Sequence, residues 1–356
     1  MHVIVLGAGE VGSYVAERLS KQGVDVAVVE VGLGGRLDTT NTVRANLSVL
    51  TPIDLDHTAV LGTTPEVIAA DKAGILRPGV PVVLAPQAPA VEKVLLAAAE
   101  ALGAPAVLVG RDVTWDERET ALGPIMDISL PGRLFPGATG GLTWPRRYKV
   151  ECSLHGPYQR VNTAVAATVA AALDDTWQPV SRAAVEFGLL RTRWPGRLEQ
   201  LPAASGHRTG TVVVDGAHNP HAARALAAAL EDRYPGRRVV LLVGVSRGKD
   251  ASGIMTALAP MAEEVVVTAS RHPKALPAPD LAAVALPPGT HPHVADTVEE
   301  ALEAALGLAG PADLVVATGS LFVAAAVREL WLAKLGIPMP PRDGPPVARR
   351  RPGRPR

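Results

Sequence analysis

Glycines and an acidic residue near the start of the chain are typical of a dinucleotide-binding site. Gly7, Gly9 and Gly12 form a G-x-G-x-x-G motif directly after an apolar run and at the start of a helical pattern. Such glycines permit a tight turn and the close approach of a pyrophosphate to a helix N-terminus. Glu30 ends the next apolar run, near the spacing expected for an acid that binds a ribose. The motif predicts binding of NAD(H) or ATP; the alternative is that the glycines only form a turn between strand and helix.

A second group of polar residues begins at the same acid. The segment from Glu30 to Asn41 reads E-V-G-L-G-G-R-L-D-T-T-N, and a carboxylate beside a glycine-rich turn suits a magnesium ligand near a phosphate. Asp56 and His57 follow the next apolar run, where open α/β sheets bind their ligands. Lys72 ends the following helical pattern, in the sequence D-K-A-G-I. Each of these residues alone is more often structural or solvated, so the prediction depends on their combination and order.

Amide and guanidinium groups occur at two later positions. Gln159 and Asn162 lie in L-H-G-P-Y-Q-R-V-N, at the start of a helical pattern. Arg197, in W-P-G-R, offers a planar fork of donors that suits a phosphate. The alternative is that the two amides are only polar surface residues of a helix.

A last motif, V-D-G-A-H-N-P, ends an apolar run and opens a helical pattern. It contains Asp215, His218 and Asn219. In open α/β sheets such a position lies at the crevice beyond the carboxyl ends of the strands. We therefore expect these three side chains in a ligand site.

The elements that position these residues alternate between strand and helix. This alternation predicts an α/β fold with a mainly parallel sheet and helices on both faces. Short alternating pieces between Arg111 and Glu151 predict β-hairpins instead. Strands are expected at His2–Leu6, Asp25–Glu30, Leu47–Pro52, Val80–Ala85, Thr211–Asp215, Arg238–Gly244, Glu264–Ala269 and Asp313–Thr318. Helices are expected at Ser13–Gln22, Pro65–Ile75, Pro89–Leu102, Gln159–Ala172, Ser181–Leu190, Pro220–Tyr234, Asp250–Ala262, Val298–Leu308 and Ser320–Leu335.

Composition fits a globular protein of two domains. The chain has 356 residues, of which 47% are hydrophobic and 20% charged, enough for packed cores. Its net charge of zero argues against general attraction to nucleic acid or an anionic membrane. Cys152 is the only cysteine, which excludes an internal disulfide framework. The sequence shows no signal peptide and no run of about 18 apolar residues, so we expect a cytoplasmic protein without a membrane span.

The chain divides by pattern into three parts. Residues 1–190 are expected to form a nucleotide-binding domain that starts with the G-x-G-x-x-G motif. The break at R-T-R-W-P-G predicts a second α/β domain over residues 191–336. Residues 337–356 are rich in proline, glycine and arginine and are expected to be a disordered tail.

From about Glu30 to Leu335 the order of motifs resembles the folylpolyglutamate synthase/dihydrofolate synthase family of ATP-dependent amide ligases, in the Mur-ligase group. The resemblance implies a Mur-ligase-type central domain and a Rossmann-like C-terminal domain. It implies that ATP and Mg²⁺ are used to join L-glutamate to a folate or dihydropteroate. It also implies a soluble, monomeric enzyme of one-carbon metabolism.

The resemblance assigns roles to single residues. Glu30 and His57 would hold magnesium, and Lys72 would be carbamylated and supply an anionic oxygen ligand to the metal. The amides of Gln159 and Asn162 would meet the adenine. The guanidinium of Arg197 would reach the ATP phosphates, and the V-D-G-A-H-N-P residues Asp215, His218 and Asn219 would close on the nucleotide and the amino acid.

The start of the chain departs from the family. The family's phosphate loop, G-T-N-G-K-G-S, does not occur in the sequence. Residues 1–30 resemble instead the nucleotide-binding start of Trk-type potassium-uptake regulators. We therefore expect an N-terminally truncated ligase preceded by a dinucleotide-type segment. Two other functions stay open: a non-catalytic NAD(H)- or ATP-binding regulatory module, and a folded remnant that binds nothing tightly.

Overall fold

The computed structural model describes residues 2–7, 26–118, 120, 124–135, 145–176, 180–203, 210–284 and 291–338. The chain forms two compact units. The first comprises residues 1–198 and 219–236, and the second comprises residues 199–218 and 237–356. The division into domains at residue 190 stays a prediction.

A five-stranded parallel sheet organises the first unit, in the order β2-β1-β3-β4-β5. Its inner strands read as continuous apolar runs because both faces of the sheet are covered. The strands are β1 (His2–Gly7), β2 (Val26–Glu30), β3 (Leu47–Leu50), β4 (Val82–Leu84) and β5 (Ala106–Leu108).

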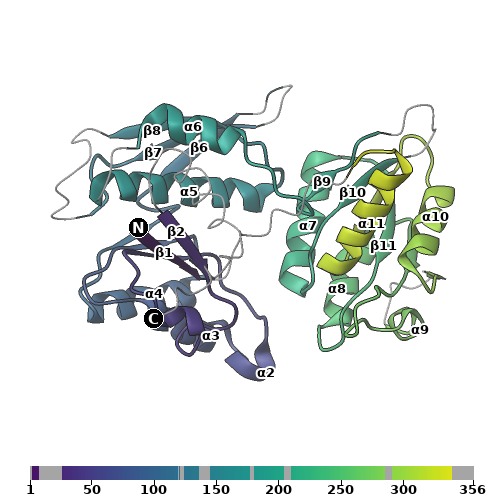
Figure 1. Ribbon diagram of the computed structural model, residues 1–356, viewed down its shortest axis with the longest axis horizontal. Coiled ribbons are helices and arrows are strands. Elements are labelled where there is room, and N and C mark those ends of the chain that lie inside the picture. The colour runs from purple at the N-terminus through teal and green to yellow at the C-terminus, as the bar shows by residue number, and fades with distance from the viewer. Residues whose placement is uncertain are drawn as a thin grey trace, which may run out of the picture. The chain divides into compact units, whose positions relative to one another are not determined.

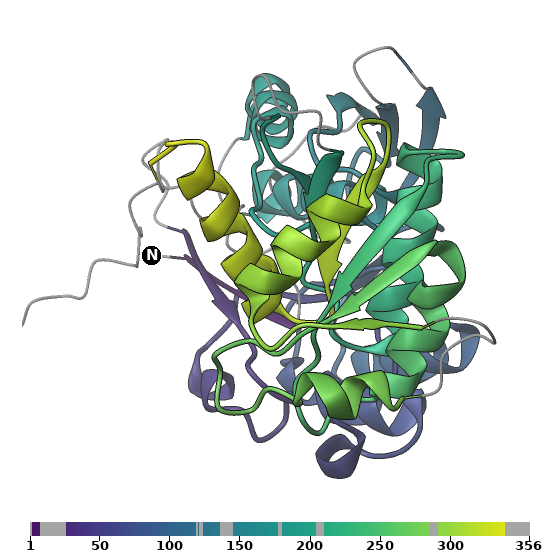
Figure 2. The ribbon, with the colours of Figure 1, turned by 90° about the vertical axis from the view of Figure 1, so that its right-hand side faces the viewer.

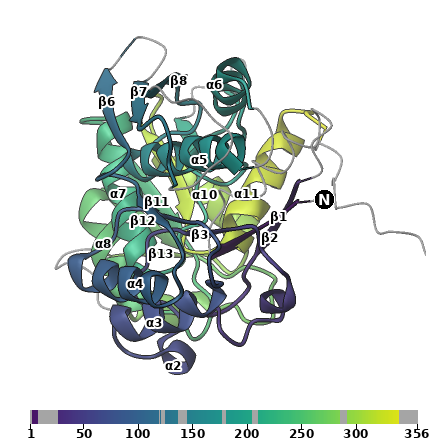
Figure 3. The ribbon, with the colours of Figure 1, turned by 90° about the vertical axis from the view of Figure 1, so that its left-hand side faces the viewer.

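Helices cover the two faces of this sheet, with α5 on one side and α3 and α4 on the other (Figures 1 and 3). Alternate residues of β4 explain this arrangement: Val83 packs in the cluster that contains α5, and Val82 and Leu84 pack with α3 and α4. The helices of this part are η1 (Thr39–Thr42), α2 (Thr58–Leu61), α3 (Pro65–Lys72), η2 (Ala73–Ile75), α4 (Pro89–Ala101), α5 (Pro157–Thr176) and α6 (Arg182–Leu190).

The expected β-hairpins form a three-stranded antiparallel sheet, β6 (Thr114–Arg118), β7 (Ile125–Leu130) and β8 (Arg146–Glu151). A buried ion network ties this sheet to the end of α5. The Arg146 guanidinium contacts Asp174 at 3.1 Å and also contacts Asp175. The second carboxylate oxygen of Asp175 accepts a hydrogen bond from the backbone N–H of Leu134 at 2.9 Å.

Helix α7 (Pro220–Arg233) completes the first unit by packing on α5. Gly156, which precedes α5, has φ +99°, and a side chain there would meet Ala229 of α7 at 2.8 Å. Arg160 forms an ion pair with Asp232 at 3.0 Å. A close contact of Gly156 with the Ala229 side chain and a charge pair therefore fix the second half of α7.

The second unit is a six-stranded sheet in the order β13-β12-β11-β14-β10-β9, parallel except for β9. Helices α10 and α11 lie side by side over one of its faces (Figure 2). The strands are β9 (Glu199–Gln200), β10 (Thr211–Val214), β11 (Val239–Val243), β12 (Glu264–Val267), β13 (His293–Val294) and β14 (Leu314–Thr318). The helices are α8 (Ala251–Leu258), η3 (Ala259–Met261), α9 (Ala278–Ala282), α10 (Val298–Leu308) and α11 (Leu321–Lys334).

The α/β class with parallel sheets is confirmed, and the long elements lie where the sequence predicts them. The helix expected at Ser13–Gln22, parts of the segment between Arg111 and Glu151 and most of the tail lie outside the described residues. The elements that the sequence did not predict are short, such as β9, β13 and α2. Within the described ranges, no helix combines the length and apolar character that a membrane span requires.

Candidate functional site

The glycine-rich turn after Glu30 is held by the carboxylate of Asp38. Asp38 Oδ2 accepts hydrogen bonds from the backbone N–H groups of Gly32 at 3.1 Å and Leu33 at 3.0 Å. Its Oδ1 accepts hydrogen bonds from the backbone N–H and the hydroxyl of Thr40, at 2.9 and 2.6 Å. The bond from the Thr40 hydroxyl, followed by the backbone bonds, holds the pKa of Asp38 below its ordinary value. Asp38 is therefore a charged anchor for the turn.

The turn packs directly against the end of α3. A side chain at Gly35 would come within 2.8 Å of Lys72 Cα, and one at Gly74 within 2.6 Å of Arg36 Cα. The backbone N–H of Arg36 donates to the carbonyl of Asp71 at 3.0 Å. Glycine is required at both positions because the two backbones touch there.

Two polar side chains fasten the same segments together. Asn41 Nδ2 donates to the carbonyls of Arg36 at 3.0 Å and Gly74 at 3.1 Å. Arg77 Nη2 donates to the backbone carbonyl of Asn41 at 2.5 Å and to its Oδ1 at 2.6 Å. The G-L-G-G turn and the K-A-G-I segment, separate in sequence, are therefore held together by side-chain hydrogen bonds and close backbone contact.

Lys72 lines a pocket of about 220 Å³ beside these two segments. Burial lowers the pKa of the Lys72 amine, and the carboxylates of Asp71, Asp56 and Asp38 oppose that shift. The remaining lining residues come from the glycine turn, the segment after β3, helices α2 and α3 and the start of α7: Gly32, Leu33, Gly34, Pro52, Ile53, Asp54, Leu55, Asp56, His57, Leu61, Ile68, Asn219 and His221.

His57 lies at the mouth of this pocket in an unusual backbone conformation. Its φ of +50° is in the left-handed region, which non-glycine residues seldom adopt and which often marks functional positions. The backbone N–H of His57 donates to Asp56 Oδ1 at 2.8 Å, and its Nε2 lies 3.9 Å from Asp56 Oδ2. The imidazole is about half exposed, so it can meet a ligand in the pocket.

The first turn of α7 reaches the same pocket. Asn219 Nδ2 donates to Asp56 Oδ2 at 3.0 Å, and its Oδ1 caps α7 by accepting from the N–H of Ala222 at 2.8 Å. His221 Nδ1 lies 2.6 Å from Asp54 Oδ2. Lys72, His57 and Asn219 therefore line one pocket, and the roles that the sequence assigns to them stay predictions.

Gln159 and Asn162 meet at the start of α5. The carboxamide of Asn162 donates to Gln159 Oε1 at 3.1 Å. Gln159 is buried, and its Nε2 has no hydrogen-bond partner among the described residues. A buried amide donor without a partner is costly unless a ligand or water accepts its proton.

Arg197 follows a tight turn at the end of the first unit. Gly196 before it has φ +77°, and Leu198 after it has φ +42°. The backbone N–H of Arg197 donates to the carbonyl of Trp194 at 3.3 Å, and the Arg197 side chain is half-buried. The turn thus fixes the backbone from which the guanidinium extends.

Asp215 and His218 belong to the second unit and follow β10. Asp215 is buried, and its Oδ1 accepts from the N–H of Ala217 at 2.8 Å. His218 Nδ1 lies 2.9 Å from the carbonyl oxygen of Gly216. In a neutral ring Nδ1 therefore carries the proton, and Nε2 is the acceptor.

The remaining predicted site residues either lie at the ends of strands β1 and β2 or fall outside the described residues. Gly7 ends β1, and Glu30, exposed, ends the neighbouring β2 without lining the pocket. Gly9 and Gly12 lie outside the described residues. In the part of the chain that the structure describes, no three or more His, Cys, Asp and Glu side chains form a metal-binding group.

Three residues with clear roles were missed by the sequence argument: Asp38, Arg77 and His221. The D-T-T sequence at Asp38 is a signal for a side chain that caps the following turn. No local signal marks Arg77 or His221, because their partners Asn41 and Asp54 lie 36 and 167 residues away.

Comparisons with known proteins agree with this arrangement. Residues 196–321 match the family model of the Mur ligase glutamate ligase domain. The dihydrofolate synthase/folylpolyglutamate synthase of Mycobacterium tuberculosis is 34% identical, over 86% of this chain and 65% of its own length. The folylpolyglutamate synthase of Lacticaseibacillus casei is 32% identical, over 87% of this chain and 67% of its own length.

A solved structure of this family is also similar to the chain. The M. tuberculosis folylpolyglutamate synthase, complexed with ADP and AMPPCP, matches with a TM-score of 0.74 and 32% identity. The match covers 88% of this chain and 70% of that one. The chain therefore spans about two thirds of the length of the relatives it matches.

Proposed function

Because the chain belongs to the folylpolyglutamate synthase/dihydrofolate synthase family of Mur ligases, we propose that it joins L-glutamate to a folate or dihydropteroate carboxylate with ATP. The γ-phosphoryl group of ATP moves to a carboxylate oxygen and leaves ADP. The glutamate amine attacks the carbonyl carbon of the acyl phosphate, loses a proton and expels phosphate as the amide forms.

The observation that carries the proposal is the environment of Lys72. Its amine lines a polar pocket with Asp56 and His57, and burial lowers its pKa. A lowered pKa increases the fraction of neutral amine, the form that reacts with carbon dioxide to give a carbamate. The carbamate would add an anionic oxygen beside His57, the predicted magnesium ligand that lines the same pocket. Glu30 does not line that pocket and is proposed as a ligand by resemblance to the family alone.

The described His, Cys, Asp and Glu side chains form no group of three that could hold a metal ion, so a magnesium ion in this pocket would depend on the carbamylated Lys72. The oxygen-rich pocket suits this hard cation. When bound, magnesium neutralises charge on the transferring phosphoryl group. The orphaned Gln159 Nε2 can donate to a ring nitrogen of adenine, Arg197 can contact phosphate, and Asn219 holds Asp56 in the pocket.

Asp215 and His218 are proposed to act on the amino acid. His218 Nε2 is the acceptor nitrogen of the neutral ring and can take the proton that the glutamate amine loses as it attacks.

Calorimetric titration with Mg-ATP, followed by an ADP-release assay, tests the proposal. We expect magnesium-dependent ATP binding, and ADP release that requires both L-glutamate and a folate or dihydropteroate. Lys72→Met should abolish ADP release, whereas Arg44→Gln, at an exposed position outside the pocket, should not change it. Absence of ATP binding by the unaltered chain would refute the ligase function.

A non-catalytic NAD(H)- or ATP-binding module is the second candidate. The favouring observation is that Leu6 pairs with Glu30, so the start of the G-x-G-x-x-G motif and this acid lie at neighbouring strand ends. NADH titration of the Glu30→Gln variant separates the two functions. Retained NADH binding with lost Mg-ATP binding would exclude this module, because ribose recognition requires the carboxylate.

A further inference from the structure

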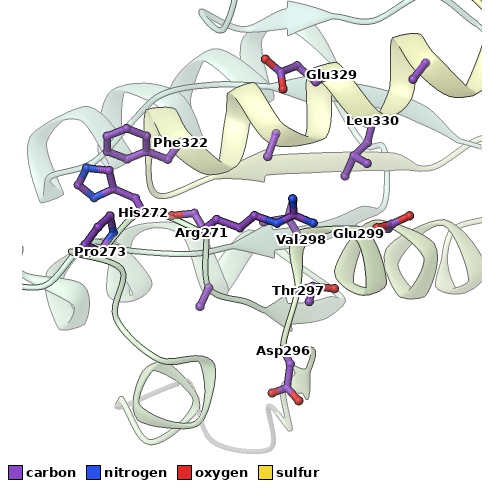
Figure 4. Close-up of a pocket in the computed structure, with 14 residues that line it drawn as sticks. Arg271, His272, Pro273, Asp296, Thr297, Val298, Glu299, Phe322, Glu329 and Leu330 are labelled. Atoms are coloured by element: carbon purple, nitrogen blue, oxygen red, sulfur yellow. The ribbon is translucent and has the colours of Figure 1, made fainter.

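A groove in the second unit contains none of the predicted catalytic or nucleotide-binding residues. It is bounded by residues 269–273 after β12, the start of α10 and one face of α11 (Figure 4). Its volume of about 760 Å³ is within the range of roughly 300–1,000 Å³ found for small-molecule sites. The groove is therefore large enough for a small organic ligand.

The floor of the groove is apolar. Val298 is buried, and Ala326 and Leu330 are half-buried along one face of α11. Phe322, one turn before Ala326, keeps 47% of its surface exposed. An exposed aromatic ring beside an apolar floor provides a surface on which another flat ring can pack.

The aromatic end of the groove is held rigidly. The His272 ring stacks on Phe322, with 3.9 Å between centroids and 16° between planes. His272 Nδ1 also accepts a hydrogen bond from the backbone N–H of Lys274 at 3.2 Å. Arg247 fixes the loop further on, because its Nε donates to the carbonyl of Ala275 at 3.1 Å. A ligand would therefore bind a surface that is already ordered, which lowers the entropy cost of binding.

Opposite charges lie along the groove. The Arg271 side chain extends from the His272 end toward Val298 and Glu299 (Figure 4). Over the described ranges, neither the Arg271 guanidinium nor the Glu299 carboxylate has an ion-pair partner. The capping box of α10, in which Thr297 and Glu300 bond each other, fixes the backbone next to Glu299. One unpaired cation and one unpaired anion thus border the same apolar floor.

We propose that this groove binds a free aromatic α-amino acid, a function separate from the proposed ligase reaction. The ring packs beside Phe322 and on the apolar floor, the carboxylate pairs with Arg271, and the ammonium pairs with Glu299. Asp296, Glu299 and Glu329 outnumber Arg271 among the lining residues, so the groove disfavours polyanions such as nucleotides. A zwitterion matches both signs of charge.

Equilibrium dialysis of the full chain with labelled L-tryptophan tests the proposal. We expect saturable binding at one site. Tryptamine lacks the carboxylate, 3-indolepropionate lacks the ammonium and L-alanine lacks the ring, so each should compete at least about tenfold more weakly. Equal competition by all three would overturn the proposal, as would no binding of L-tryptophan.

Two charge variants locate the site. Arg271→Gln should weaken L-tryptophan binding about tenfold and leave tryptamine binding unchanged, because tryptamine has no group for Arg271. Glu299→Gln should weaken L-tryptophan and leave 3-indolepropionate unchanged. Arg44→Gln and Glu100→Gln, exposed in the first unit, are the matched controls. The replaced side chains are exposed, so the melting temperatures of the four variants without ligand should agree with that of the unaltered chain. If all four variants bind L-tryptophan equally well, the site is refuted.

Discussion

Asp38→Ala removes one carboxylate and should loosen the turn that carries the candidate site. The carboxylate accepts four hydrogen bonds, from the N–H groups of Gly32, Leu33 and Thr40 and from the Thr40 hydroxyl. The same turn brings Gly35 against the backbone of Lys72. The variant should therefore lower both the stability of the first unit and its affinity for Mg-ATP.

The size of the effect follows from where the four bonds lie. Loss of a capping side chain costs about 0.5–2 kcal/mol. Gly32 and Leu33 are exposed, so water can replace the carboxylate at their N–H groups. Most of the loss then comes from the partly buried bonds of Thr40, and we expect about 2 kcal/mol of unfolding free energy in total.

The pH dependence has a definite sign. The folded-state pKa of Asp38 lies below 3.8, its ordinary value, because its hydrogen bonds favour the carboxylate. The contribution of this ionisation is therefore full above pH 3.8 and is lost as pH falls through the lower folded-state pKa. Asp38→Asn should lack this part of the acid dependence while keeping an acceptor oxygen.

Urea unfolding at neutral and acidic pH measures these changes. Asp116→Ala, at an exposed position of β6, is the matched control and should stay close to the unaltered chain. Equal stability of Asp38→Ala and Asp116→Ala at neutral pH would show that the Asp38 bonds do not hold the turn.

Three other substitutions test single contacts. Asp175→Ala leaves the buried Arg146 with Asp174 as its one carboxylate partner among the described residues, beside the carbonyl of Ala171, and urea unfolding should show a loss of about 3 kcal/mol; a loss below 1 kcal/mol would contradict this role. Gly35→Ala forces a methyl group to 2.8 Å from Lys72 Cα, so calorimetry should show weaker Mg-ATP binding and about 2 kcal/mol lower stability. Thr268→Val replaces a buried hydroxyl that has no partner among the described residues, so the melting temperature should stay equal or rise; a clear fall would reveal a hidden hydrogen bond.

The long elements were predictable because burial marks them in the sequence. Strands such as Val239–Val243 are buried along their whole length and read as unbroken apolar runs. The capping residues of α7 and α10, Asn219 and Thr297, precede their helices as capping rules require. Two-residue strands such as β9 and β13 carry too few residues for a pattern.

The candidate site was predictable only as an ordered set of motifs. The proximity of Lys72 to the glycine turn depends on Gly35, whose need for close backbone contact is invisible without the fold. The His221–Asp54 contact joins residues 167 positions apart, and a single sequence gives no signal for such a pair. The groove beside Arg271 combines three separate segments, so no motif marks it.

Oxygen transfer from the acceptor carboxylate to phosphate tests the proposed function most directly. The acceptor folate or dihydropteroate is labelled with ¹⁸O in its carboxylate and incubated with the chain, Mg-ATP and L-glutamate. An acyl phosphate requires that one labelled oxygen leave with the released phosphate while the acceptor gains one glutamyl residue. Mass spectrometry should find both changes in equal amounts; a glutamylated product with unlabelled phosphate, or no product at all, would contradict the proposed reaction.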